Sequence, residues 1–152
     1  MKKLLLIQAS GGLRRGLSYT QSKYPSLALG IVAGLSPEGW DVQILDSLNA
    51  SYTGYSADLV AITAYTPTVN VAYQIAFHYR ERKIPVIIGG IHATLVPDEA
   101  MLYCDSVVTG EAESIWPEVI SDFEKGELKK IYKATILRCL IIFQIWISEI
   151  HF

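Results

Sequence analysis

Residues 59–68 read Leu-Val-Ala-Ile-Thr-Ala-Tyr-Thr-Pro-Thr, an apolar run followed by small and hydroxyl-bearing residues and a proline. A short continuous apolar run is typical of a strand that is covered on both faces of a sheet. Pro67 suits the first turn of a helix, because that turn needs no hydrogen bond from its nitrogen. Apolar residues at helical spacing follow it, namely Val69, Ala72, Tyr73, Ala76 and Tyr79. The stretch therefore predicts a buried strand, a loop and a helix that packs against the sheet.

The same alternation of strand and helix extends in both directions from this stretch. Further strands are predicted at residues 4–8, 41–46, 85–88 and 106–109, with a short edge strand at residues 130–132. Prolines mark the first turns of further helices near Pro25, Pro97 and Pro117. We therefore predict one α/β domain, in which a doubly wound parallel sheet of about five strands lies between two layers of helices.

The composition of the chain excludes several classes of function. Its 152 residues fit a single domain. The 13 basic and 15 acidic side chains nearly balance and form no basic cluster, so we expect no nucleic-acid binding. The two cysteines, Cys104 and Cys139, lie far apart, which disfavours a disulfide scaffold or a thiolate-rich metal site and favours the reducing cytoplasm. The apolar run at the N-terminus is too short for a signal peptide.

The last residues differ in character from the rest of the chain. We expect a domain at residues 1–133 and an apolar C-terminal tail at residues 134–152. The helical length of residues 136–152 would be about 25 Å, less than the roughly 30 Å of a membrane core, so we expect no membrane crossing. Two interpretations stay open. The tail is a non-native product of truncation, frameshift or cloning, or it is a native segment that packs on the domain or joins two copies into a homo-oligomer.

The loops at one edge of the predicted sheet are where a ligand is expected. In a doubly wound sheet, ligands bind outside the carboxyl ends of the strands, near the point where the strand order reverses. The loops at this edge are small, hydroxyl-bearing or glycine-rich, and they comprise residues 8–12, 64–68, 89–94 and 110–113. Such residues let a backbone approach a ligand closely and supply hydrogen-bonding groups.

Common uses of this fold are excluded by their missing motifs. The chain has no GxxxxGK[ST] phosphate loop, no GxGxxG after the first strand and no GxSxG elbow of a hydrolase. The first strand ends in Gln8-Ala9-Ser10, without the clustered acids of a receiver domain.

Five segments, in matching order and spacing, carry a specific resemblance. They are Tyr-Pro-Ser-Leu-Ala-Leu-Gly at 24–30, Gly-Trp-Asp-Val at 39–42, Ala-Tyr-Thr-Pro-Thr at 64–68, Gly-Gly-Ile-His-Ala-Thr at 89–94 and Thr-Gly-Glu-Ala-Glu at 109–113. Together they resemble the N-terminal cobalamin (vitamin B12)-binding domain of B12-dependent radical SAM enzymes. The resemblance implies a flavodoxin-like five-stranded sheet whose carboxyl edge holds the corrin ring and the nucleotide tail of the cofactor.

The resemblance also implies which residues lie near cobalamin. The loop after the third strand, with Thr63, Ala64, Tyr65 and Thr66, is expected near the corrin. The loop after the fourth strand is expected to line the tail or the lower corrin face through Gly89, Gly90, His92 and Thr94. The resemblance places Gly110 and Glu111 beside them, and Gln8 and Ser10 at the end of the first strand.

Two departures from related families limit what the resemblance implies. Other cobalamin domains carry a DxHxxG motif whose histidine ligates cobalt, and residues 8–12 contain neither its acid nor its imidazole. We therefore expect no cobalt ligand from the first strand and assign no metal ligand to the protein. For His92, three roles stay open: a cobalt ligand, another contact in the ligand loop, or a turn histidine that bonds backbone or caps the next helix.

The second departure concerns catalysis. Radical SAM relatives continue into a barrel with a CxxxCxxC motif for an iron–sulfur cluster, which the two cysteines of this chain cannot form. We therefore assign no catalytic residue, and we expect a cobalamin-binding module without catalysis of its own, the N-terminal fragment of a B12-dependent radical SAM methyltransferase or related enzyme. Its expected partner is the radical SAM barrel of the full-length protein. The alternative is an independent flavodoxin-like domain that binds flavin or another small molecule at the same loops.

Overall fold

A parallel sheet of six strands forms the centre of the computed structural model, which describes residues 1–11, 13–14, 17–18, 26–47 and 51–134. The strands are β1 (Lys3–Gln8), β4 (Asp41–Asp46), β5 (Leu59–Thr63), β6 (Val86–Gly89), β7 (Ser106–Thr109) and β8 (Ile131–Lys133). Their spatial order is β4-β1-β5-β6-β7-β8, and every neighbouring pair is parallel. The order reverses between β1 and β5, as expected of a doubly wound sheet.

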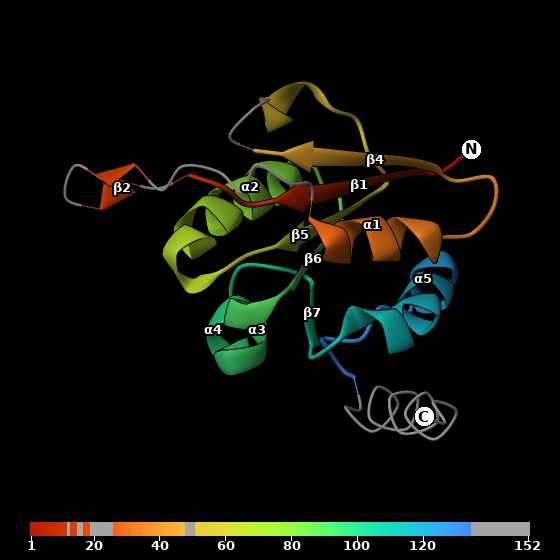
Figure 1. Cartoon of the computed structure of the whole chain (residues 1–152). Helices are drawn as coiled ribbons and strands as arrows, with labels where there is room; N and C mark the ends of the chain where they lie inside the picture. Colours follow the sequence, from red (N-terminus) through yellow and green to blue (C-terminus); the bar gives the residue numbers. More distant parts are fainter. Residues whose placement is uncertain (12, 15–16, 19–25, 48–50, 135–152) are drawn as a thin grey trace, which may run out of the picture.

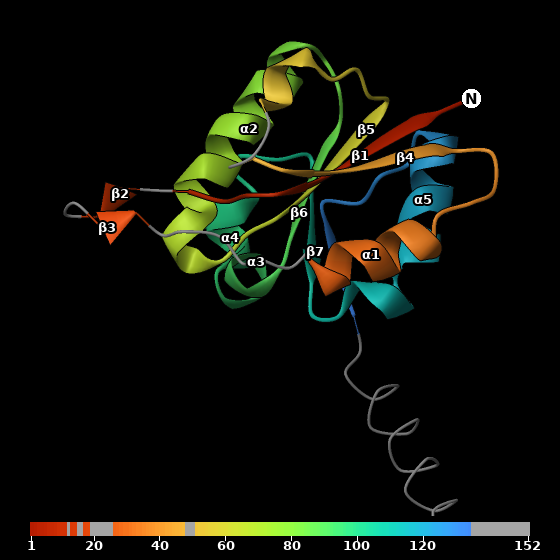
Figure 2. The same cartoon turned by 45° about the horizontal axis from the view of Figure 1, so that its top comes forward.

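Helices cover both faces of this sheet (Figures 1 and 2). They are α1 (Leu27–Gly34), α2 (Val69–Glu81), α3 (Ile91–Leu95), α4 (Pro97–Ala100) and α5 (Trp116–Lys125), with single 3₁₀ turns η1 (Tyr52–Gly54), η2 (Thr66–Thr68) and η3 (Ala112–Ser114). Helices α1 and α5 lie on one face, whereas α2, α3 and α4 lie on the other (Figure 2). The domain therefore has the three layers that the strand and helix pattern predicts.

Alternate residues of each strand supply the two halves of the core. On β1, Leu5 and Ile7 pack toward the α2 layer, and Leu4 and Leu6 pack toward the α1 and α5 layer. All four side chains are at most 2% exposed. A strand buried on both faces needs apolar residues at nearly every position, which is why β1, β5, β6 and β7 read as apolar runs in the sequence, whereas the edge strand β4 (Asp-Val-Gln-Ile-Leu-Asp) does not.

The predicted fold class is confirmed: the domain is a flavodoxin-like, doubly wound α/β sheet. The edge strand predicted near residues 130–132 is present as β8, one residue further along, and makes the sheet six-stranded. Helix α3 was not expected, because residues 89–94 read as a loop; five residues are too few to reveal a helical period. Within the polar connection after β1, β2 (Leu13–Arg14) and β3 (Leu17–Ser18) form a small antiparallel ladder.

The predictions for the C-terminal tail, including a homo-oligomer formed through it, concern residues 135–152, which lie outside the described residues. Within the described part of the chain, no helix has the length and apolar character needed to span a membrane.

Candidate functional site

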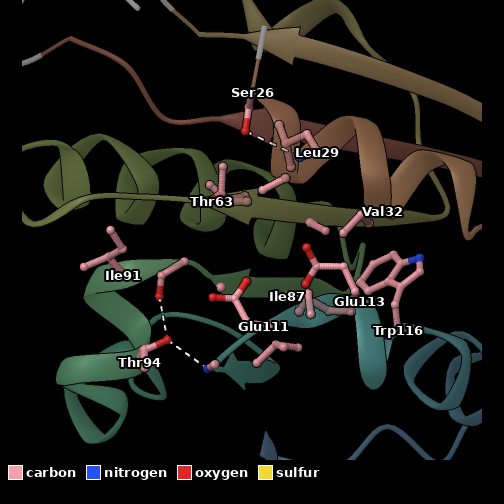
Figure 3. A pocket seen from close by; sticks show the side chains of 18 of the residues that line it. Ser26, Leu29, Val32, Thr63, Ile87, Ile91, Thr94, Glu111, Glu113 and Trp116 are labelled. Atoms are coloured by element: carbon pink, nitrogen blue, oxygen red, sulfur yellow. Dashed lines mark hydrogen bonds between the residues drawn. The ribbon is translucent and has the colours of Figure 1, made fainter. Parts of the chain in front are cut away.

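A cavity of about 400 Å³ opens at the carboxyl edge of the sheet (Figure 3). Ala61, Ile87 and Val108, from β5, β6 and β7, form its apolar floor. Leu29 and Val32 of α1 form one wall. The segment from Gly110 to Trp116, which leads from β7 into α5, contributes the opposite wall. The cavity thus lies at the carboxyl edge of the sheet, where a ligand is expected in a doubly wound fold.

The loop after β6 meets the loop after β5 at the rim of this cavity. Gly90 has a φ of +93°, a conformation that side-chain-bearing residues rarely adopt. A Cβ atom at this position would lie 2.6 Å from Thr63 Oγ1 and 3.0 Å from the carbonyl oxygen of Ala64. Only glycine therefore lets the two loops approach so closely, and both Thr63 and Gly90 line the cavity.

Thr94 joins the loops after β6 and β7. Its hydroxyl donates to the carbonyl oxygen of Gly90 at 2.9 Å and accepts the Gly110 N–H at 2.9 Å (Figure 3). Both glycines have positive φ, a conformation that glycine adopts without steric cost. The hydroxyl of Thr94 thus links the loop after β6 to the loop after β7 at the rim of the cavity.

The charge of the cavity is negative. Glu111 and Glu113 are the charged side chains among the described residues that line it, and both lie among the other lining side chains (Figure 3). Trp116 lies beside them at 2% exposure, and its indole N–H donates to Ser36 Oγ at 3.1 Å. The arrangement combines a large apolar surface with carboxylate and hydroxyl acceptors on one side, which suits a ligand with a flat apolar part and amide donors.

The predicted site residues separate into two groups in the structure. Those that line the cavity are Thr63, Tyr65, Gly89, Gly90, Thr94, Gly110 and Glu111. The others lie at the same edge without lining it. Ala64 is buried beneath the rim at 2% exposure, and Thr66 lies on the exposed turn that follows. Gln8 is the last residue of β1 and Ser10 lies two residues beyond it; the backbones of both bond Ser47 in the loop after β4.

His92 lies on the far side of this edge from the cavity, inside the α2 layer. Its side chain is 6% exposed. Nδ1 lies 3.2 Å from Thr66 Oγ1, and Nε2 lies 3.5 Å from Glu99 Oε1 and 3.4 Å from the hydroxyl of Tyr73. Both ring nitrogens therefore have partners within the domain, and this geometry disfavours a role as a cobalt ligand.

The Tyr73 hydroxyl donates to Glu99 Oε1 at 2.9 Å. Burial, and secondly this bond to Glu99, raise the pKa of Tyr73 well above its usual value, so the phenol stays protonated and remains a donor.

Sequence reasoning missed the helical wall of the cavity. Ser26, Ala28, Leu29 and Val32 of the α1 segment all line it. The sequence did contain a signal for them, because a helix that follows β1 must begin at the same carboxyl edge as the predicted loops. The floor residues were predicted only as buried strand positions, since apolar periodicity does not distinguish a packed surface from the lining of a cavity.

Comparison with known proteins identifies the family to which this chain belongs. The family model described as the B12 binding domain matches residues 17–120. Bacteriochlorophyllide d C-12(1)-methyltransferase of Chlorobaculum tepidum is 37% identical over 142 residues, which cover 90% of this chain and 30% of that protein. Bacteriochlorophyllide d C-8(2)-methyltransferase of the same organism is 32% identical over 108 residues, covering 70% of this chain and 24% of that protein. The chain thus spans less than a third of these curated relatives.

Among solved structures, the N-terminal domain of a hypothetical Thermotoga maritima protein is 24% identical with a TM-score of 0.45, covering 80% of this chain and 98% of that chain. The family model covers more than half of the chain and includes β5, β6, β7 and the loops of the cavity. The chain therefore belongs to the B12-binding domain family.

Proposed function

We propose that this domain binds cobalamin at the carboxyl edge of its sheet, with the nucleotide tail in the cavity and the corrin over the loops after β5 and β6. The observation that carries the proposal is the apolar cavity of about 400 Å³ at the edge where the family resemblance predicts the cofactor. The bound molecule would supply a cobalt centre that can accept and donate a methyl group. The protein's own part is to bind and orient it.

The residues of the cavity fit the chemistry of this cofactor. The tail of cobalamin ends in a flat bicyclic base, which favours the apolar floor of Ala61, Ile87 and Val108. The corrin carries primary amide side chains, whose N–H groups are suitable donors to the carboxylates of Glu111 and Glu113. Tyr65 is 53% exposed at the rim, where its ring can cover the flat face of the corrin.

Retention of cobalamin by the purified chain tests the proposal. The chain is mixed with hydroxocobalamin and desalted, and its visible spectrum is recorded. The expected result is corrin absorbance in the protein fraction, shifted toward the form in which the base of the tail has left cobalt. A protein fraction without corrin would refute the proposal, and a chain that is yellow as purified would favour the alternative flavin ligand.

Two variants on neighbouring residues of α1 make the test specific to the cavity. Ala28 lines the cavity and is exposed, so Ala28→Trp adds an indole to the lining without disturbing the core. Leu27 is 78% exposed and is not part of the lining, so Leu27→Trp is the matched control. We expect Ala28→Trp to lose cobalamin and Leu27→Trp to keep it; equal binding by both variants would place the ligand elsewhere.

We further propose that the domain holds cobalamin for a methyltransferase of the radical SAM class, whose catalytic barrel lies outside this sequence. Two observations support this: the resemblance of five segments to that class, and two similar proteins that are named as methyltransferases and are more than three times the aligned length. The encoding DNA beyond residue 152 tests it when read in all three frames. A CxxxCxxC motif within a further barrel-sized segment is expected, and its absence from every frame would contradict the proposal.

A further inference from the structure

A buried histidine beneath the cavity rim has no part in the cavity itself. His92 belongs to α3, yet its contacts reach three other elements: Thr66 in η2, Tyr73 in α2 and Glu99 in α4. A polar side chain at 6% exposure costs free energy unless each polar atom is bonded, so these contacts are a condition of its burial.

The hydrogen-bonding capacity of its neighbours determines how the imidazole is protonated. A carboxylate only accepts hydrogen bonds, and the Tyr73 hydroxyl already donates its proton to Glu99. The hydrogen of a neutral ring must therefore be on Nε2, which faces both of these oxygens. Nδ1 is then an acceptor for the hydroxyl of Thr66. The contacts of Nε2 with Tyr73 and Glu99 thus orient the ring, and the unprotonated Nδ1 accepts a hydrogen bond from the Thr66 hydroxyl.

Through Thr66, this histidine controls the turn that carries Tyr65. The His92 N–H donates to the carbonyl oxygen of Ala64 at 3.3 Å, and the ring bonds Thr66, so the turn is held on both sides of Tyr65. Thr68 closes the turn, since its hydroxyl bonds both the N–H and the carbonyl oxygen of Tyr65 at 3.2 Å. Tyr65 itself lines the cavity.

We propose that His92 is a positioning residue that fixes the 64–68 turn from inside the domain and so holds Tyr65 at the mouth of the cavity for its ligand. This inference rests on the proposed function, because it assigns Tyr65 a place against cobalamin. It deepens that function by identifying a pre-organised rim whose orientation is set by a buried side chain that does not contact the ligand.

Two substitutions at His92 test the contacts of its two ring nitrogens separately. In His92→Asn, the side-chain amide places an acceptor where Nδ1 lies, which keeps the bond to Thr66 and loses the contacts of Nε2 with Tyr73 and Glu99. In His92→Gln, the amide reaches the place of Nε2, which keeps the contacts with Tyr73 and Glu99 and loses the bond to Thr66. Thr66→Val removes the hydroxyl from an exposed position, so it tests the same bond without altering the core. His78→Gln is the matched control, since His78 lies half-buried beside Tyr52 and away from the rim.

Each variant of the full chain is measured in two ways: amide hydrogen exchange of residues 64–68 without ligand, and hydroxocobalamin affinity by absorbance titration. We expect His92→Gln and Thr66→Val to speed exchange at Tyr65 and Thr68, and to weaken binding, each by about threefold to tenfold. His92→Asn, which keeps the acceptor for Thr66, should lose less binding than His92→Gln, and the control His78→Gln should stay within about twofold of the wild type. The double variant His92→Gln/Thr66→Val should be no worse than either single variant, because both remove one bond.

Unchanged exchange in both His92→Gln and Thr66→Val would overturn the proposal, and so would equal losses of binding in His92→Asn and His92→Gln. If the His92 variants do not fold, Thr66→Val decides the question by the same two measurements. If the wild type itself does not bind hydroxocobalamin, the proposed function and the ligand part of this inference both fail, whereas the exchange data still decide whether His92 fixes the turn.

Discussion

Substitution of Gly90 by alanine should destabilise the domain strongly, although it adds a single methyl group. The φ of +93° and ψ of −172° at this residue lie in a region that is almost restricted to glycine, where another residue costs about 1–3 kcal/mol. The added Cβ would also lie 2.6 Å from Thr63 Oγ1, 3.0 Å from Ala64 O and 3.1 Å from Ala64 N.

The Thr63 hydroxyl can move by side-chain rotation, but the backbone of Ala64 cannot move without disturbing its bond to Gly89, which joins the two loops. Relief of such crowding typically costs about 1–3 kcal/mol. We therefore expect Gly90→Ala to lower the free energy of unfolding by about 2–6 kcal/mol, a large part of the about 5–15 kcal/mol of a typical domain.

The neighbouring glycine provides the control. A Cβ at Gly89 would lie 3.5 Å from the carbonyl oxygen of Val108 and 3.8 Å from its Cβ, which are ordinary contacts, and its φ is not positive. Alanine also loses less conformational entropy in a strand than glycine does, by about 0.5–1 kcal/mol. Gly89→Ala should thus leave stability unchanged or raise it slightly.

Urea unfolding followed by far-ultraviolet circular dichroism measures both variants. Gly90→Ala should shift the midpoint to lower urea with an unchanged slope, because the surface exposed on unfolding stays the same. A Gly90→Ala variant within about 0.5 kcal/mol of the wild type would disprove the strain assigned to this position. A Gly89→Ala variant that lost as much stability as Gly90→Ala would disprove it too.

Three further outcomes are expected. Tyr65→Ala should weaken hydroxocobalamin binding about fivefold to tenfold, as for a lost aromatic contact, and should leave the unfolding midpoint unchanged because the side chain is 53% exposed; absorbance titration and urea unfolding check this. Iodoacetamide at about pH 8 should leave Cys104 unmodified in the folded chain, because burial raises the pKa of its thiol to about 11; peptide mass spectrometry detects any alkylation, and rapid labelling of the native chain would contradict the burial. Hydrogen bonds from the Tyr132 hydroxyl and then the Lys129 ammonium lower the pKa of Asp122 below its usual 3.8. Its carboxylate therefore stabilises the fold above pH 3.8 and loses this effect as the pH falls through the lowered value, so Asp122→Asn should reduce the acid dependence of the unfolding midpoint.

The pattern of amino acids alone specifies the sheet, the order of its elements and the edge where a ligand belongs. The central strands β1, β5, β6 and β7 are buried on both faces, so each is a nearly continuous apolar run that stands out from the helical spacing around it. Parallel strands also bring their carboxyl ends to one edge, so the prediction of a parallel sheet is enough to group the loops at residues 64–68 and 89–94.

Packing in three dimensions determines how these loops are used. The cavity exists because α1 and the segment after β7 stand apart over the floor of β5, β6 and β7, and the distance between helices depends on side-chain packing that no periodicity encodes. The orientation of His92 likewise depends on α3, a helix of five residues that begins directly after the positive φ of Gly90. The sequence identified this histidine as a residue of the ligand loop, whereas the packing of α2 and α4 around it turned its ring away from the cavity and toward Glu99 and Thr66.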